Sequence, residues 1–192
     1  MARERKFTTA DLFQATEQIL LQHGYEGFTF SLLAEQLEVS RGALYKYFDN
    51  REELITEYMI YEMGRFLAEL KQIELHKDFE EQFTILLNLI FQNSAVPYMI
   101  EIGRRIPING NNKVRQNIES LGRLHFEMYN YCQRLVTKGK MEQKIKSSIP
   151  DSVIIGMIFQ AIMIPNRLHI PQSEWTASIQ ELLCHGILKR SN

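Results

Sequence analysis

The side chains best suited to chemistry lie close together in residues 29–51. Between Ser40 and Phe48 the chain carries two cations, Arg41 and Lys46, and no acid. An arginine can donate to the O6 and N7 atoms of guanine in the major groove of duplex DNA, and a lysine can neutralise a backbone phosphate. This composition favours binding to nucleic acid, with Arg41 contacting either a base or a phosphate.

Hydroxyl-bearing and small residues surround the two cations. Threonine and tyrosine hydroxyls can donate to phosphate oxygens, and a glycine lets a helix approach the base edges closely. The predicted DNA contacts are Thr29, Ser40, Arg41, Gly42, Ala43, Tyr45, Lys46, Tyr47 and Arg51. Arg3, Arg5 and Lys6 could form an arm along the DNA backbone or in the minor groove. On spacing alone, an amphipathic helix pair whose charges face water fits equally well.

Two short helices must position this surface. Thr29 and Ser40 are suited to cap helices that we expect over residues 30–37 and 41–48. Ala34 is small at the point where the two helices must cross closely. The apolar side chains that can hold this crossing are Leu33, Leu37, Val39, Leu44 and Phe48. The arrangement is that of a helix-turn-helix.

The remaining chain shows helix-capping patterns and no alternation typical of strands. The expected N-caps are Thr8 or Thr9, Thr29, Ser40, Asn50, Asp78 and Ser173. Asn50 and Glu53 form a capping-box pattern that opens a helix to about residue 75. Gly24 and Gly139 are expected to end the helices that precede them. The sequence therefore predicts an all-α fold of about nine helices, with a domain boundary near residue 50.

The segment from Ala10 to Leu54 resembles the DNA-binding domain of TetR-type (TetR/AcrR) transcriptional regulators. The residues that carry the resemblance are Gly24, Tyr25, Phe28, Thr29, Leu33, Ala34, Val39, Ser40, Gly42, Leu44, Tyr45, Tyr47, Phe48, Arg51 and Leu54. The family pattern has a glycine where this chain has Glu38, often a threonine at Ala43, and usually a lysine at Arg51. The resemblance implies a three-helix DNA-binding domain at residues 1–50 and a helical effector-binding and dimerisation domain at residues 51–192.

The resemblance also implies a small effector and a homodimer formed through the last two helices. Apolar and aromatic candidates for a largely apolar effector are Tyr61, Phe66, Phe83, Phe91, Met99, Phe126, Tyr129 and Phe159. The predicted dimer contacts are Ile155, Phe159, Met163, Trp175, Ile179 and Leu183. Each of these side chains would also suit an ordinary core. A basic cluster, formed by Arg134, Lys138, Lys140, Lys144 and Lys146, is expected to be a solvated helix end and loop, with a second phosphate-binding surface as the alternative.

Several function classes find no support in the sequence. The formal net charge of -1 argues against a protein that coats nucleic acid by charge alone. Neither the five histidines nor Cys132 and Cys184 show metal-ligand spacing, and no catalytic motif is present, so we expect no enzyme, metal or cofactor. No signal peptide is visible, and the longest apolar stretch, residues 153–164, is too short to span a bilayer. We therefore expect a cytoplasmic protein without a membrane partner.

These observations predict a ligand-responsive transcriptional regulator. We expect a homodimeric repressor that binds double-stranded DNA at a palindromic operator and leaves it when a small, largely apolar effector binds. The alternative is a helical protein-interaction module without DNA binding. The salt dependence of DNA binding separates the two, because neutralising phosphates releases counterions.

Overall fold

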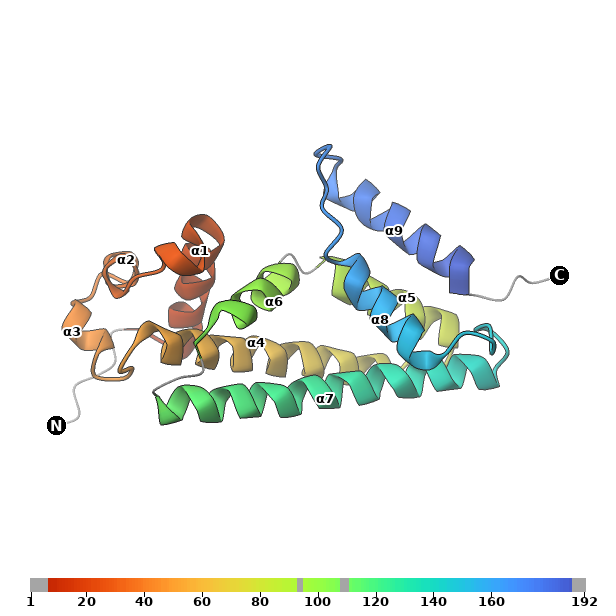
Figure 1. The fold of residues 1–192 in the computed structure, drawn as a ribbon, viewed down its shortest axis with the longest axis horizontal. Coiled ribbons are helices and arrows are strands. Elements are labelled where there is room, and N and C mark those ends of the chain that lie inside the picture. The colour runs from red at the N-terminus through yellow and green to blue at the C-terminus, as the bar shows by residue number, and fades with distance from the viewer. Residues whose placement is uncertain (1–6, 93–94, 108–110, 188–192) are drawn as a thin grey trace. The chain divides into compact units, whose positions relative to one another are not determined.

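Helices account for most of the chain that the structure describes. The computed structural model describes residues 7–92, 95–107 and 111–187 (Figure 1). Within these ranges the nine helices are α1 (Thr9–Gly27), α2 (Phe30–Gln36), α3 (Arg41–Leu44), α4 (Arg51–Ile73), α5 (Phe79–Gln92), α6 (Ala95–Arg105), α7 (Asn112–Met141), α8 (Asp151–Ala161) and α9 (Gln172–Ile187). The prediction of an all-α fold of about nine helices is confirmed.

Side-chain caps begin several helices at the predicted residues. Thr8, Thr29, Asn50 and Asp78 each accept a hydrogen bond from the backbone N–H three residues further on, at 3.1, 3.3, 2.8 and 3.0 Å. Such caps satisfy N–H groups that have no partner within the helix. Ser173 differs from its prediction, because α9 already begins at Gln172.

Two glycines predicted to end helices have different effects. Gly24, with φ 71°, interrupts α1 as predicted, although one more helical turn follows it to Gly27. Gly139 does not end α7, which continues to Met141, so that prediction is wrong. A Cβ atom at position 139 would lie 2.5 Å from the ring of Phe79, so close packing against that ring requires a glycine there.

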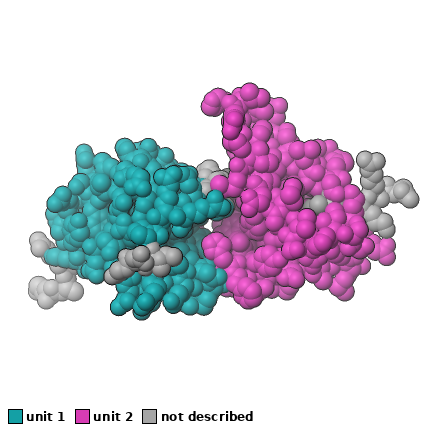
Figure 2. Space-filling view, in the orientation of Figure 1, with its two compact units in different colours: residues 1–63, 98–123 teal, residues 64–97, 124–192 magenta. Residues whose placement is uncertain are grey.

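Packing divides the chain into two compact units, coloured separately in Figure 2. The first unit comprises residues 1–63 and 98–123, and the second comprises residues 64–97 and 124–192. The predicted boundary at residue 50 falls inside the first unit, because side chains from the start of α4, from α6 and from the start of α7 share one core with α1–α3. The functional division into residues 1–50 and 51–192 stays a prediction.

Polar bonds join the helices of the first unit. The hydroxyl of Tyr98 on α6 donates to the backbone carbonyl of Leu20 on α1. Asn117 Nδ2 on α7 donates to Thr56 Oγ1 on α4 at 2.9 Å, and both side chains are buried. These bonds attach α6 and the beginning of α7 to the helices that carry the helix-turn-helix.

In the second unit, α9 contacts both α5 and α8. Phe79 and Phe83 of α5 are buried and their rings stack with centroids 5.5 Å apart. Gln82, also buried, donates to the carbonyl of His76 at 2.6 Å and accepts from Lys138 Nζ at 2.8 Å. In the part of the chain that the structure describes, no helix has both the length and the apolar character needed to cross a membrane.

Candidate nucleic-acid interface

A small apolar core holds α2 and α3 together. Leu33 and Leu44 are completely buried, and Ala34 and Phe48 are nearly so. The predicted core is present, but α3 is shorter than the predicted range 41–48. The carbonyl of Leu44 accepts from the N–H of Tyr47 at 2.9 Å, an i to i+3 bond that tightens the chain into a turn where the helix ends.

The α3 surface, which we define as Arg41, Gly42, Tyr45, Lys46 and Tyr47, is exposed. Arg41 Nη1 donates to Ser31 Oγ at 3.2 Å, and Lys46 forms no ion pair with any of the described residues. These two cations therefore have no carboxylate partner among the described residues. The predicted arm of Arg3, Arg5 and Lys6 lies outside the described residues.

Two tyrosines of the α3 surface rest against phenylalanines. The ring of Tyr45 meets that of Phe30 edge-on, with centroids 4.9 Å apart, and Tyr47 meets Phe7 in the same way at 6.2 Å. Tyr45 nevertheless remains 54% exposed and Tyr47 43% exposed. Apolar contacts thus fix the rings while much of each side chain stays accessible to a partner.

The small residues of this segment differ in their surroundings. A Cβ atom at Gly42 would come no closer than 4.0 Å to Ser40 Oγ, so packing within the chain does not explain the glycine. An open position there leaves room for another molecule to approach the α3 backbone. Ala43 is half-buried, whereas Thr29 and Ser40 are exposed. The hydroxyl of Thr29 also caps α2.

The turn between α2 and α3 contains a residue in the left-handed region of backbone space. Glu38 has φ 53°. Its N–H donates to the carbonyl of Glu35 at 3.1 Å, and the N–H of Val39 donates to Ala34 at 2.9 Å. Glycine adopts this conformation without the steric cost that a side chain adds, which explains why the resembled family has glycine here.

Arg51 differs from the other predicted DNA contacts because its guanidinium is engaged within the chain. Nη1 donates to the carbonyls of Tyr25 and Phe28, both at 3.2 Å, and Nε donates to Glu52 Oε1 at 2.8 Å. The guanidinium also lies 4.7 Å from the centroid of the Tyr25 ring. The hydrogen bond to Glu52 raises the pKa of Arg51, so the group is a permanent cation. Residue spacing alone does not indicate these contacts.

The predicted effector residues are divided between the two units. Tyr61 and Met99 belong to the first unit, and Phe66, Phe83, Phe91, Phe126, Tyr129 and Phe159 belong to the second. Phe83 and Phe91 are buried in the second unit, whereas Phe126 is 67% exposed. Their role in effector binding stays a prediction.

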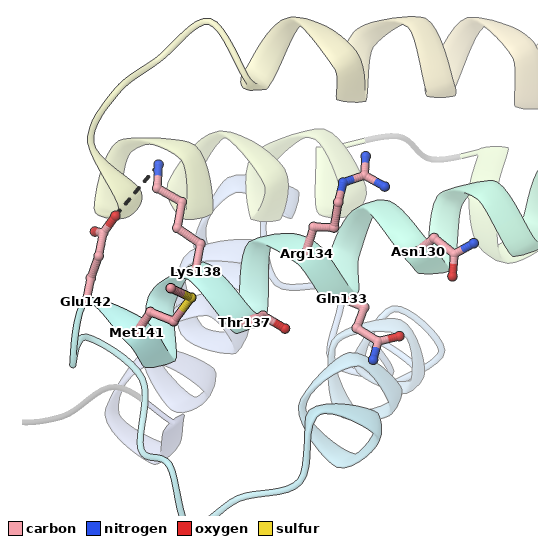
Figure 3. A pocket seen from close by; sticks show the side chains of 7 residues that line it. All are labelled: Asn130, Gln133, Arg134, Thr137, Lys138, Met141 and Glu142. Carbon is pink, nitrogen blue, oxygen red and sulfur yellow. Dashed lines mark ion pairs between the residues drawn. The ribbon is translucent and has the colours of Figure 1, made fainter.

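A pocket of about 650 Å³ lies along α7 in the second unit (Figure 3). It is lined by Asn130, Gln133, Arg134, Thr137, Lys138, Met141 and Glu142, and by none of the predicted effector residues. The lining residues recur at the three- and four-residue spacing of one helix face. The apolar and aromatic candidates did not indicate this pocket, because most of its lining residues are polar or charged.

The predicted dimer contacts divide into buried and accessible side chains. Ile155, Ile179 and Leu183 are buried within the chain, so they are not available to a partner. Phe159 and Trp175 are half-buried, and Met163 is exposed. Other apolar side chains of α8 and α9 are more accessible: Val153 at 49%, Met157 at 53% and Leu182 at 74%. Because α8 is apolar on nearly all sides, its sequence does not indicate which face is outward.

The basic cluster at the end of α7 is tied into the second unit. Arg134 pairs with Glu74 at 3.2 Å, Lys140 with Asp151 at 2.5 Å and Lys144 with Glu80 at 2.7 Å. Lys138 donates to Gln82 Oε1 at 2.8 Å, and Lys146 donates to the Gly186 carbonyl at 2.7 Å. The prediction of a merely solvated helix end therefore missed these partners. The alternative of a second phosphate-binding surface gains no support, because the cations are already engaged.

Chemistry other than binding finds few candidates. Among the described residues, no group of three or more histidine, cysteine, aspartate or glutamate side chains could hold a metal ion. Burial raises the pKa of the Cys132 thiol to about 12, so this cysteine is an unreactive core residue.

Comparison with known proteins agrees with this geometry. The sequence model of bacterial regulatory proteins of the tetR family matches residues 12–58, which include the whole helix-turn-helix. A fatty acid metabolism regulator protein of Bacillus subtilis is 22% identical over 184 residues, which cover 92% of this chain and 93% of that protein.

Solved structures share the fold over nearly the whole chain. The FadR transcriptional regulator of Bacillus subtilis in complex with stearoyl-CoA is 21% identical with a TM-score of 0.68, covering 94% of this chain and 100% of that chain. A ketosteroid transcriptional regulator of Mycobacterium tuberculosis is 14% identical with a TM-score of 0.73, covering 99% and 98%. At these identities the likeness shows the fold.

Proposed function

The chain belongs to the TetR family of DNA-binding transcriptional regulators, and from this premise we propose that its α3 surface reads a specific operator under the control of a small effector. Members of this family are regulators and not enzymes, in agreement with the expectation of no catalytic residues. The observation that carries the proposal is the exposure of Arg41 and Lys46 without a carboxylate partner among the described residues.

Each residue of the α3 surface has a proposed role. Arg41 donates to a guanine in the major groove, and Lys46 neutralises a phosphate. Gly42 allows close approach of the backbone, with Ala43 beside it, and the hydroxyls of Tyr45, Tyr47, Thr29 and Ser40 donate to phosphate oxygens. Arg51 leaves this set, because its Nη1 and Nε atoms already donate to acceptors within the chain.

A homodimer would place two α3 surfaces on a palindromic operator. Successive major grooves on one side of DNA are about 34–36 Å apart, so each subunit would read one half-site. We propose that the exposed apolar side chains of α8 and α9, led by Val153, Met157 and Leu182, pack against a second copy of the chain. The support is that a helix that is apolar on nearly all sides requires cover on most of its surface.

The proposed effector is a fatty acyl-CoA or a similar molecule with a long apolar chain. The support is the FadR protein of Bacillus subtilis, solved with stearoyl-CoA, which aligns with 94% of this chain. Binding would favour a conformation with low operator affinity, which releases a repressor from DNA. The regulator would act in the cytoplasm, where its operator lies.

Selection of bound genomic fragments, followed by binding measurements over a salt series, tests the proposal. We expect specific fragments whose affinity falls steeply with salt, and release when stearoyl-CoA is added but not when coenzyme A alone is added. Failure to bind any DNA at about 50 mM salt would overturn the DNA-binding role and favour a protein-interaction module. Binding that stearoyl-CoA leaves unchanged would overturn the effector class alone.

A further inference from the structure

Arg51 caps a helix that ends more than twenty residues earlier in the chain. Its Nη1 atom donates to the backbone carbonyls of Tyr25, Glu26 and Phe28 at 3.2, 3.4 and 3.2 Å. These carbonyls lie at the end of α1 and in the step to α2, where a helix leaves its last carbonyls without partners. One guanidinium group therefore satisfies several acceptors of the α1–α2 junction.

The other side of the guanidinium is held by a second set of contacts. Arg51 Nε donates to Glu52 Oε1 at 2.8 Å, and the hydroxyl of Tyr25 donates to the same oxygen at 3.2 Å. Tyr25 is 5% exposed, and its ring lies 4.7 Å from the guanidinium carbon. Arg51, Glu52 and Tyr25 thus form a closed circuit between the start of α4 and the end of α1.

The contacts of Arg51 join the two ends of the segment that contains the helix-turn-helix. The carbonyl of Phe28 immediately precedes Thr29, the N-cap of α2, and Arg51 is the first residue of α4. Residues 29–50, which contain α2, the turn and α3, therefore form a loop whose two ends are joined by the contacts of Arg51. The geometry of the α3 surface depends on this closure as well as on the core beneath it.

We propose that Arg51 is a positioning residue that closes this loop and holds the α3 surface in the shape that binds the operator, and that it does not contact phosphate. The proposal rests on the proposed DNA-binding function. It also explains why arginine stands at a position where the resembled family usually has lysine. A lysine ammonium is a point charge on a flexible stem and lacks the planar, multiply donating group that these contacts use.

Lysine and glutamine substitutions distinguish positioning from phosphate contact. For R51K and R51Q we expect operator affinity to fall about tenfold, with the slope of log affinity against log salt unchanged. A phosphate contact would give a different result. R51K would then keep its affinity, and R51Q would lower the salt slope by about 1 per subunit. Either of these last outcomes would overturn the proposal.

Matched variants control for general effects. R115K changes an exposed arginine that donates to Asn112 on its own helix, and we expect wild-type affinity and slope from it. E52Q leaves the carbonyl contacts of Arg51 in place while weakening the circuit, so its loss of affinity should be smaller than that of R51K. An equal loss of operator affinity in R115K and R51K would count against a specific role of Arg51.

Hydrogen exchange provides a measurement that does not require DNA. We expect amides of residues 29–48 to exchange faster in R51K than in the wild type, while amides of α5 and α9 keep their rates. Unchanged exchange in residues 29–48 would overturn the positioning role even if DNA binding were lost for another reason. If the wild type bound no DNA, the proposed function would fail, and exchange would still decide whether Arg51 orders this segment.

Discussion

Two groups of cations in the described part of the chain differ sharply in their surroundings. Arg41 and Lys46 on the α3 surface are exposed and have no carboxylate partner among the described residues. The basic cluster at the end of α7 has more cations, yet its members bind carboxylates, an amide oxygen and a backbone carbonyl of the second unit. Since neutralising phosphates requires cations that are free to meet them, we predict that the smaller group is the better polyanion site.

The comparison shows that partners, and not the number of charges, distinguish a binding surface from a structural one. By number alone, the five cations between residues 134 and 146 exceed the two between residues 41 and 46. In the structure, acids distant in sequence engage the larger group, whereas the smaller group, predicted from the sequence to contact DNA, has no carboxylate partner among the described residues. The following predictions test this difference.

The largest effect is expected at the α3 surface. Replacing Arg41 by alanine should weaken operator binding on the order of 100-fold, because a base contact and a positive charge are lost together. Lys46→Gln should weaken binding to all sequences alike and lower the salt slope by about 1 per subunit. Fluorescence anisotropy with labelled operator over a salt series measures both. Wild-type affinity in the two variants would end the assignment of this surface to DNA.

A core substitution beneath the basic cluster should affect stability and leave operator binding intact. Gly139→Ala places a Cβ atom 2.5 Å from the Phe79 ring and 2.9 Å from Ile145, and should lower the free energy of unfolding by about 1–3 kcal/mol. Urea denaturation measures this loss. Gly64→Ala is a suitable control, because a Cβ atom there would meet no other atom within 4 Å. Equal stability of the two variants would contradict the close packing at Gly139.

Removing one cation from the basic cluster should have a smaller effect. Lys140→Gln breaks the ion pair with Asp151, and we expect unfolding free energy to fall by about 1 kcal/mol. Operator affinity should stay within about twofold of the wild type, in contrast to Lys46→Gln. Thermal unfolding and the same anisotropy assay give the two values. A reduced salt slope in Lys140→Gln would show that the cluster meets DNA, and would remove the contrast between the two groups.

The smallest effect is expected in the turn between α2 and α3, where we expect a substitution to increase stability. Glu38→Gly should raise the free energy of unfolding by about 0.5–1 kcal/mol, because glycine adopts the φ of 53° without steric cost. Glu38→Gln removes the same negative charge and keeps the strained backbone. Comparing the two by urea denaturation separates the backbone effect from the charge effect. The backbone explanation would be abandoned if glutamine stabilised the protein as much as glycine.

Local spacing was sufficient to predict the helices and the helix-turn-helix core. Thr29 caps α2 and Leu33 and Leu44 are buried, as expected, because caps and helix faces depend on residues within one or two turns. The Gly139 prediction failed because a glycine read as a helix end is needed instead by the distant ring of Phe79. No neighbouring residue in the sequence indicates that contact.

The functional residues show the same limit. Most partners of Arg51 and of the basic cluster lie at least nine residues away, so periodicity could not reveal them. The exceptions are Glu52, Glu142 and Tyr131. The outward face of α8 could not be predicted either, because a helix that is apolar on nearly all sides has no polar face to mark its orientation.

The buried bond between Asn117 and Thr56 has a consequence for how the first unit can move. Both side chains are buried, and Thr56 also donates to the carbonyl of Glu52 at 2.8 Å. Sliding α7 along α4 by a single residue would leave the Asn117 amide without an acceptor in a setting where an unmet polar group is costly. The bond therefore fixes the register of the two helices. Any rearrangement must either carry both helices together or break this bond in one discrete step.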